Sequence, residues 1–379
     1  MKSFHAVFFA GAALTLLHLP FARANLHDLP DNTARDLGGY TCSGAEGAGN
    51  SRCRSITDYS RFTYDPVRRQ MLMFGGGHSA TMSDYVDVFS FNTLTWAPAY
   101  PSTPCSDMTL ANWNLAHKWN SSGNPAARHT YDLLPITKDG RYLILLNGVF
   151  AQGSECGEHG TGPGSIAHYD IAAKTWAFGT PPPWGNTASG ELDPVSGKIL
   201  VIKYEMVYTY DPSTRVVAAI SNSAPIFGYA DNLAYFPPND KFYYIKRGNP
   251  VRVWEISVSA AGRNTLSSIG SIVEVTGMQG TPSTGETGFA YDSVNQVIGG
   301  GVAGGVFHAF NPLTKIWTSQ VMQLESQTAP AIGRVAYHAL DYSTADNVYI
   351  FITEGRRTWA YRYQNSTAAP ILLFGSGFE

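Results

Sequence analysis

A short run of alternating apolar residues, ending near an Asp or a Pro, recurs six times along this chain. The copies lie at intervals of roughly 40 to 70 residues, a spacing typical of repeat architectures. Alternation with a period of two predicts a β-strand with one buried face. The six copies occupy residues 62–66, 129–133, 190–194, 233–237, 289–293 and 338–342.

Each copy leads through a tight turn into a second apolar run, and a third run rich in aromatic residues follows. In three units a Trp after the next turn opens a fourth run, at Trp96, Trp176 and Trp317. The content of 38 Gly and 22 Pro suits short strands joined by many turns. The pattern therefore predicts an all-β chain of six four-stranded sheets, with the large aromatic side chains packed between neighbouring sheets.

Residues 72–77, Leu-Met-Phe-Gly-Gly-Gly, followed by Tyr85, Phe91 and Trp96, resemble the Kelch repeat. The unit at 299–317 also keeps its glycines and its Trp. The resemblance covers residues 59–364 and implies a Kelch-type β-propeller, similar to the central domain of galactose oxidase. It implies about six four-stranded blades, with seven as the alternative. The fourth strand of the last blade is expected from either the N-terminal segment or residues 370–374.

The N-terminus has the features of an export signal. Lys2 provides a positive charge, residues 6–17 are mostly apolar, and residues 22–24, Ala-Arg-Ala, form a cleavage site. We expect a signal peptide at 1–24, a Gly-rich segment at 25–57, the propeller at 58–365 and a tail at 366–379. The mature protein is then secreted or periplasmic, with no later segment apolar enough to span a membrane.

Four cysteines remain after cleavage, and an even number in an exported protein favours disulfides. The preferred pairs are Cys42–Cys53 and Cys105–Cys156, although four cysteines allow three pairings. No C-x-x-C spacing is present, so no metal site is expected.

The charge balance restricts the partners. The formal net charge is −3 and charged residues make up 15% of the chain, so the protein has no basic field for nucleic acid. No P-loop, G-x-S-x-G or H-E-x-x-H motif occurs, and no cofactor is expected. We expect a monomer that binds a carbohydrate or another extracellular ligand.

The Kelch resemblance also places a candidate site. In such blades the turn entering the first strand and the turn leaving the second open on the same rim of the channel. Long loops on a rigid scaffold commonly carry binding, and the long insertion at 101–125 is expected to cover this rim. The ligand-binding candidates there are Arg61, Trp113, His117, Lys203, Glu205, Lys246 and Arg247.

The excess of cationic groups on this rim favours an anionic or polyhydroxylated ligand. A non-catalytic glycan-binding propeller is the first hypothesis. The alternative is a polysaccharide lyase, in which Arg neutralises a uronate carboxylate while His or Tyr moves the protons of a β-elimination. Its candidate catalytic residues are His78, Arg128, His129, Arg334 and His338. A copper oxidase similar to galactose oxidase is a remote third.

Overall fold

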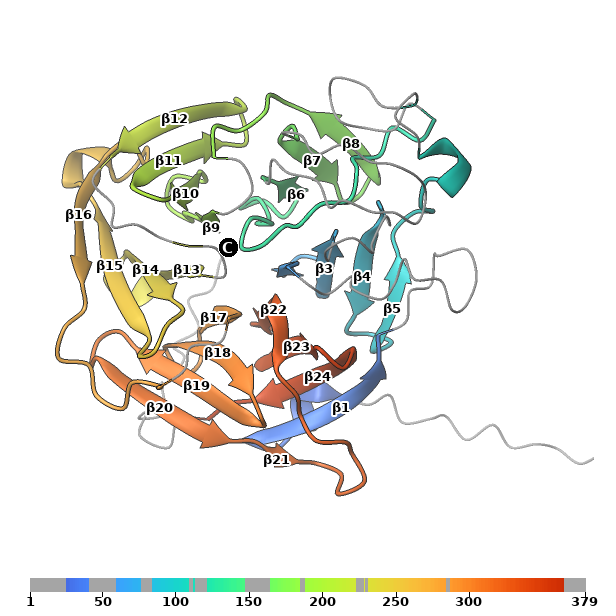
Figure 1. Cartoon of the computed structure of the whole chain (residues 1–379), viewed down its shortest axis with the longest axis vertical. Coiled ribbons are helices and arrows are strands. Elements are labelled where there is room, and N and C mark those ends of the chain that lie inside the picture. The colour runs from blue at the N-terminus through green and yellow to red at the C-terminus, as the bar shows by residue number, and fades with distance from the viewer. Residues whose placement is uncertain are drawn as a thin grey trace, which may run out of the picture.

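The computed structural model describes residues 25–40, 59–75, 84–108, 112, 121–146, 164–184, 188–222, 228, 231–283 and 287–364. Within them the chain forms six β-sheets arranged as blades around a central axis, a six-bladed β-propeller (Figure 1). In blades 1 to 5 the strands pair antiparallel in chain order from the axis outward, whereas blade 6 takes its outer strand from the N-terminal segment. The predicted all-β fold of six blades is therefore confirmed.

Blades 1 to 3 take up the first part of the ring. Blade 1 comprises β2 (Phe62–Asp65), β3 (Gln70–Phe74), β4 (Val86–Ser90) and β5 (Thr95–Pro98). Blade 2 comprises β6 (Tyr142–Leu145), β7 (Ala167–Asp170) and β8 (Thr175–Phe178). Blade 3 comprises β9 (Ser189–Leu192), β10 (Ile199–Lys203), β11 (Met206–Asp211) and β12 (Val216–Ser221).

Blades 4 to 6 complete the ring. Blade 4 comprises β13 (Asn232–Phe236), β14 (Lys241–Lys246), β15 (Arg252–Val258) and β16 (Ile269–Glu274). Blade 5 comprises β17 (Phe289–Asp292), β18 (Val297–Ala303), β19 (Val306–Asn311) and β20 (Ile316–Val321). Blade 6 comprises β22 (Val335–Ser343), β23 (Val348–Thr353), β24 (Arg357–Arg362) and β1 (Thr33–Gly39). The helices are single 3-10 turns, η1 (Leu26–Asp28), η3 (Cys105–Asp107), η5 (Pro237–Asn239) and η6 (Ala260–Gly262).

The inner segment of blade 2 is irregular. Residues 133–137 run along β6, held by hydrogen bonds from Ile144 N to Pro135 O and from Thr137 N to Tyr142 O. Pro135 has no N–H to donate, which interrupts a regular strand ladder at this position. This segment takes the place of the inner strand that the other blades form.

The N-terminal segment closes the ring. β1 pairs antiparallel with β24 as the outer strand of blade 6, and the short β21 (Gln323–Leu324) pairs parallel with β1 beyond it. Of the two expected sources of this strand, the N-terminal one is therefore correct. β1 lies inside the 25–57 segment that the sequence separates from the propeller.

The hairpins between first and second strands share one backbone feature. Each has a residue with positive φ near its end: Arg69, Gly140, Gly197, Asp240, Gln296 and Asn347. In three of them the preceding Asp accepts hydrogen bonds from N–H groups two and three residues later, as Asp65, Asp193 and Asp292 do. Such Asx turns fix the turn locally, which explains why Asp recurs in the sequence repeat.

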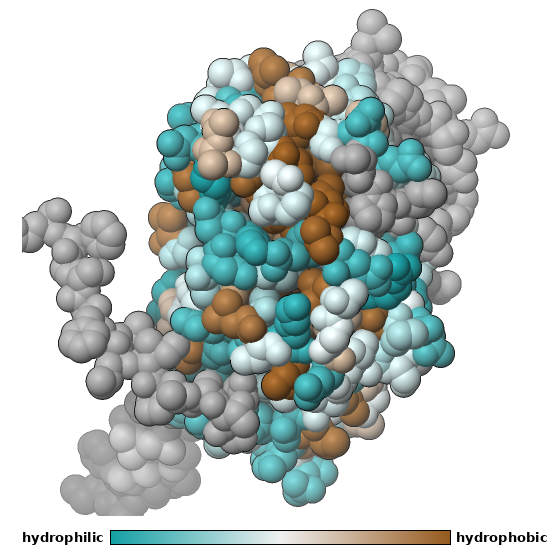
Figure 2. All heavy atoms as spheres, turned by 90° about the vertical axis from the view of Figure 1, so that its left-hand side faces the viewer, coloured by the Kyte–Doolittle hydropathy of each residue, from teal (hydrophilic) through white to brown (hydrophobic). Residues whose placement is uncertain are grey.

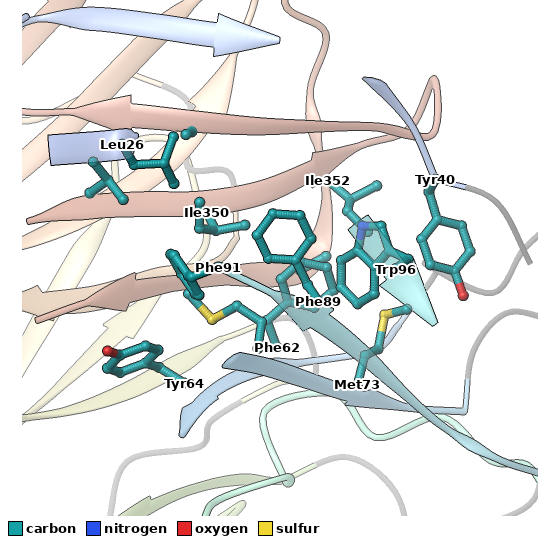
Figure 3. Close-up of a cluster of buried hydrophobic side chains, with 14 of the residues drawn as sticks. Leu26, Tyr40, Phe62, Tyr64, Met73, Phe89, Phe91, Trp96, Ile350 and Ile352 are labelled. Carbon is teal, nitrogen blue, oxygen red and sulfur yellow. The ribbon is translucent and has the colours of Figure 1, made fainter. Parts of the chain in front are cut away.

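The apolar side chains of the described residues gather in six clusters, each between two neighbouring blades. Figure 3 shows the cluster in which blade 6 and the N-terminal segment meet blade 1. There Trp96 packs on Phe62 and Phe89, and its Nε1 donates a 2.8 Å hydrogen bond to Thr358 Oγ1 of blade 6. The predicted packing role of the tryptophans is confirmed.

The strand registers correct two of the six sequence alignments. Asp65 pairs with Gln70 at the end of β2, and Ser343 and Thr137 occupy the corresponding positions in blades 6 and 2. The sequence repeat aligns Asp341 and Asp132 with Asp65, at the end of the inner strand. Both aspartates instead lie earlier in their inner segments, nearer the propeller axis, because a bulge in β22 and an irregular segment in blade 2 add residues.

The outer edge of blades 3 and 4 carries both polar and apolar residues. The side formed by β12 and β16 in Figure 1 faces the viewer in Figure 2, where polar and apolar residues are interspersed. Val216 and Val273 on these edge strands are each 56% exposed. No helix in the described part of the chain is long and apolar enough to cross a membrane.

Candidate functional site

The entry ends of the six inner strands meet at the propeller axis, and each blade contributes a polar group there to one hydrogen-bonded network. We call it the axial network, and its members in blade order are Arg61, Asp132, Glu191, Asn232, the Gly288 N–H and His338. The end of the channel at which the chain enters the inner strands is the upper mouth. The end at the first hairpins is the lower mouth.

Arg61 connects three of the blades. Its Nη1 donates to the Gly190 carbonyl at 2.7 Å and lies 3.2 Å from Asp132 Oδ1, and its Nη2 donates to Glu191 Oε2 at 2.7 Å. Only 12% of the Arg61 side chain is exposed. The guanidinium thus crosses from blade 1 to blades 2 and 3 and is held by charge-assisted hydrogen bonds.

Asn232 connects the remaining blades. Its Nδ2 donates to Asp132 Oδ1 at 3.2 Å and to His338 Nδ1 at 3.0 Å, while its Oδ1 accepts from Gly288 N at 2.9 Å. Since the Asn232 amide is the donor, the neutral His338 ring carries its proton on Nε2. His338 is 1% exposed, and its Nε2 has no hydrogen-bond partner within the described residues.

The pKa values of Asp132, Glu191 and His338 are shifted mainly by burial, whereas the neighbouring carboxylates raise the pKa of Arg61 against the effect of burial. Burial raises the pKa of Asp132 to about 7 against the opposing effect of Arg61, and it also raises the pKa of Glu191. Burial, helped by the charge of Arg61, lowers the pKa of His338 to about 3. His338 is therefore neutral at physiological pH and acts as a hydrogen-bonding group instead of a charge.

The axial network spans the channel between blades 1 and 3 and between blades 4 and 6. Its side chains are buried or half-buried and bonded to one another, so they occupy the axis at this level. On the lower side, Arg61 and Glu191 line a cavity at the mouth of the channel.

Four aromatic rings gather at the upper mouth. Tyr59 stacks on His129 with ring centroids 4.9 Å apart, and it packs against Tyr337 in a tilted arrangement with centroids 4.0 Å apart. The Tyr337 hydroxyl donates to the Tyr59 hydroxyl at 2.9 Å, and His129 Nδ1 lies 3.2 Å from the Tyr131 hydroxyl. Tyr131 N also donates to the Tyr59 carbonyl at 2.7 Å. We call these four residues the aromatic cluster.

The three tyrosines of the aromatic cluster have left-handed backbones, with φ of 58° at Tyr59, 46° at Tyr131 and 49° at Tyr337. A bulky residue in this conformation costs about 1–3 kcal/mol. At Tyr337 it results from a bulge in β22, where pairing shifts between Val335–Thr353 and Leu340–Phe351. Three such residues from three blades meeting at one point indicate that the fold holds them there at a cost in stability.

Arg128 lies directly before His129 in the sequence, but its side chain does not reach the surface of the upper mouth. It is fully buried, and its Nε and Nη1 donate to the carbonyls of Ala126 and Ser165. Burial lowers its pKa to about 9. Its backbone lies so close to Gly75 that a Cβ at that glycine would collide with the Arg128 carbonyl, which explains the first glycine of the Kelch-like run.

The other predicted cations are spread around the upper rim. Arg334 Nε donates to Glu354 Oε1 at 3.0 Å, and both side chains are exposed. Lys203, beside Glu205 in the β10–β11 hairpin, lies over the Tyr204 ring at 4.1 Å. Lys246 is the last residue of β14 and Arg247 follows it, with Arg247 N donating to Asp231 Oδ1.

Several predicted residues fall outside the described part of the chain. They are His78, Trp113, His117, Cys42, Cys53 and Cys156. Cys105 lies in η3, but its side chain is not among the described ones. The disulfide pairing and the contribution of the long insertion therefore remain predictions.

Of the predicted catalytic residues, the structure brings His129 into the aromatic cluster and His338 into the axial network. Sequence reasoning missed Tyr59, Tyr131 and Tyr337 as site residues. The repeat pattern assigns Tyr131 to a strand, and no local signal shows that a Tyr adopts positive φ or that β22 contains a bulge. Asp132 and Glu191 were likewise assigned to the repeat and not to the axis.

No protein-family model and no curated protein matches the sequence. Solved structures share the fold. One is an auxiliary nutrient binding protein from Bacteroides thetaiotaomicron, with a TM-score of 0.53 and 10% identity over 86% of this chain and 75% of its own. Another, of unknown function from the same organism, has a TM-score of 0.51 and 11% identity over 88% and 75%. At this identity the likeness extends to the fold alone.

Proposed function

We propose that this protein is a ligand-binding propeller that takes a polyhydroxylated ligand, in the first instance a glycan, at the upper mouth. The observation that carries the proposal is the aromatic cluster, in which three tyrosines with strained backbones and His129 converge from three blades beside the axial network. Local strain that the surrounding structure maintains is characteristic of functional sites.

The chemistry of the aromatic cluster suits a sugar. Tyrosine rings offer flat apolar faces for the C–H side of a pyranose, and their hydroxyls and the imidazole offer donors and acceptors for its hydroxyls. Lys203, Lys246 and Arg247 on the same rim would favour a ligand that also carries negative groups. That a propeller of similar fold bears the name of a nutrient binding protein agrees with a binding role.

The test is a glycan array followed by calorimetry on the glycans that bind. We expect Tyr59→Ala and Tyr337→Ala each to weaken binding at least about 10-fold, equivalent to about 1.4 kcal/mol. Tyr59→Phe and Tyr337→Phe keep the ring faces and remove the hydroxyls, so their affinities show which of the two contributes to binding. Tyr208→Ala, which removes a ring packed on Trp184 in blade 3, is the control. Unchanged affinity in folded Tyr59 and Tyr337 variants would place the site elsewhere.

A polysaccharide lyase is the second candidate, and the contact between His129 and the Tyr131 hydroxyl favours it because it joins two proton carriers. The two predicted arginines are engaged elsewhere, since Arg128 bonds backbone carbonyls and Arg334 bonds Glu354. Lys203, Lys246 or Arg247 would have to neutralise the uronate. If the protein is a lyase, incubation with uronate polymers should release unsaturated products, and the His129→Ala variant should lose this activity. If the protein binds these polymers without releasing product, the non-catalytic role is supported.

We also propose that the protein is exported and that its blades are of the Kelch type. The charged, apolar and small-residue order of residues 1–24 supports export, and the Gly75 contact supports the Kelch likeness. N-terminal sequencing of protein recovered outside the cytoplasm should give a start at Asn25.

A further inference from the structure

The lower mouth is a second cavity, and the glycan proposal does not use it. It encloses about 320 Å³, near the lower end of the range for small-molecule pockets. Its walls include Tyr64, Tyr235, Tyr291 and Tyr342, which come from blades 1, 4, 5 and 6. At its floor lie Arg61, Glu191 and Asp341. We call this cavity the lower funnel.

The floor of the lower funnel carries more negative than positive groups. Arg61 is the only Lys or Arg among the residues that line this funnel, and it already contacts Asp132 and Glu191. Asp341 accepts hydrogen bonds from Tyr64 N at 2.7 Å and Tyr342 N at 2.8 Å, but in the described part of the chain no cationic nitrogen lies within 4 Å of it. One guanidinium therefore serves three carboxyl groups.

The carboxyl groups of the funnel are also poorly solvated. Burial raises the pKa of both Glu191 and Asp341, and the charge of Arg61 opposes this rise in each case. The charge of Asp341 additionally raises the pKa of Glu191, so the two carboxylates repel each other. A cation placed between them would remove that repulsion and restore the ionised forms.

We propose that the lower funnel binds a small organic cation bearing an ammonium group. The ammonium would lie between Glu191 and Asp341, and the tyrosine walls would contact its carbon substituents and present ring faces to its charge. An anion is disfavoured by the excess of carboxylates, and a neutral polyol would leave that excess in place.

The test compares two probes of similar shape and different charge, tert-butylammonium and tert-butanol, by NMR titration of the whole protein. We expect the ammonium to bind at least 10-fold more tightly than the alcohol. Asp341→Asn and Glu191→Gln should each weaken it about 10-fold. Tyr291→Ala should also weaken it, whereas Tyr291→Phe should retain most of the affinity because the ring remains.

Glu274→Gln is the matched control, since it removes an exposed carboxylate of β16 that pairs with Arg252 outside the funnel. Equal binding of the two probes, or an equal effect of Glu274→Gln and Glu191→Gln, would overturn the proposal. If Asp341→Asn does not fold, the ammonium affinities of Glu191→Gln, Tyr291→Ala and Tyr291→Phe still test the proposal. The Tyr59 and Tyr337 variants should leave ammonium binding unchanged, which separates this site from the upper mouth.

Discussion

Asp87, on β4 of blade 1, is a carboxyl group buried beside the aromatic core that joins blades 1 and 6. It is 1% exposed and accepts a 2.7 Å hydrogen bond from the Tyr40 hydroxyl. Burial raises its pKa to about 8, and the Tyr40 hydrogen bond opposes the rise only in part. The folded protein therefore holds a proton that the unfolded chain releases near pH 4.

This proton makes stability depend on pH. The stabilising effect of protonated Asp87 is fully present below about pH 4 and is lost as the pH rises through about 8, at up to about 1.4 kcal/mol per unit. We expect Asp87→Asn to gain stability relative to the natural protein over this range, measured by urea unfolding at each pH. The exposed Asp31→Asn is the control; parallel pH profiles for Asp87→Asn and the natural protein would contradict the prediction.

At the scale of elements, the inner hairpins show how six unequal sequences make one structure. All six place a residue in the left-handed region at the same point of the turn, although only Gly140 and Gly197 are glycines. The turn geometry is thus common to the blades, while the residue that adopts it varies. Blades with Arg, Gln or Asp at that point are less stable locally than glycine would make them.

Exchanging residues at these positions should move stability in opposite directions. A Cβ at Gly197 would meet no atom within 4 Å, so Gly197→Ala has only a conformational cost of about 1 kcal/mol. Gln296, with φ of 51°, should gain a similar amount on Gln296→Gly, reduced by the greater freedom of glycine in the unfolded chain. Urea unfolding checks both; destabilisation by Gln296→Gly would show that its side chain matters more than its backbone.

At the scale of the molecule, β1 and the residues around it fasten the ring. Besides pairing with β24, this segment contributes Leu26, Leu29 and Tyr40 to the core between blades 6 and 1. Arg357 Nε also donates to Asp36 Oδ2 at 3.1 Å across the same pair of strands. Closure therefore joins the two ends of the propeller by main-chain, apolar and charged contacts together.

Removal of residues 25–40 should abolish cooperative folding, because it exposes the edge of β24 and opens the adjoining core. Removal of residues 366–379 should leave the unfolding midpoint nearly unchanged, since β1 already occupies the outer position of blade 6. Circular dichroism during thermal unfolding measures both. A cooperative transition in the first variant, or its loss in the second, would reverse the assignment of the closing strand.

From the sequence alone came the prediction of about six four-stranded blades, with seven as the alternative, and the packing role of Trp96 and Trp176, because alternation and turn chemistry are local properties that repeat. The tertiary structure decided what depends on register between distant strands. A bulge in β22 brings Tyr337 and His338 to the axis, and the irregular inner segment of blade 2 does the same for Asp132. Arg61, predicted on a cationic rim, instead turns inward, because the carboxyl groups of Asp132 and Glu191 and the Gly190 carbonyl contact it there. These placements follow from pairings far apart in the chain, which no local pattern encodes.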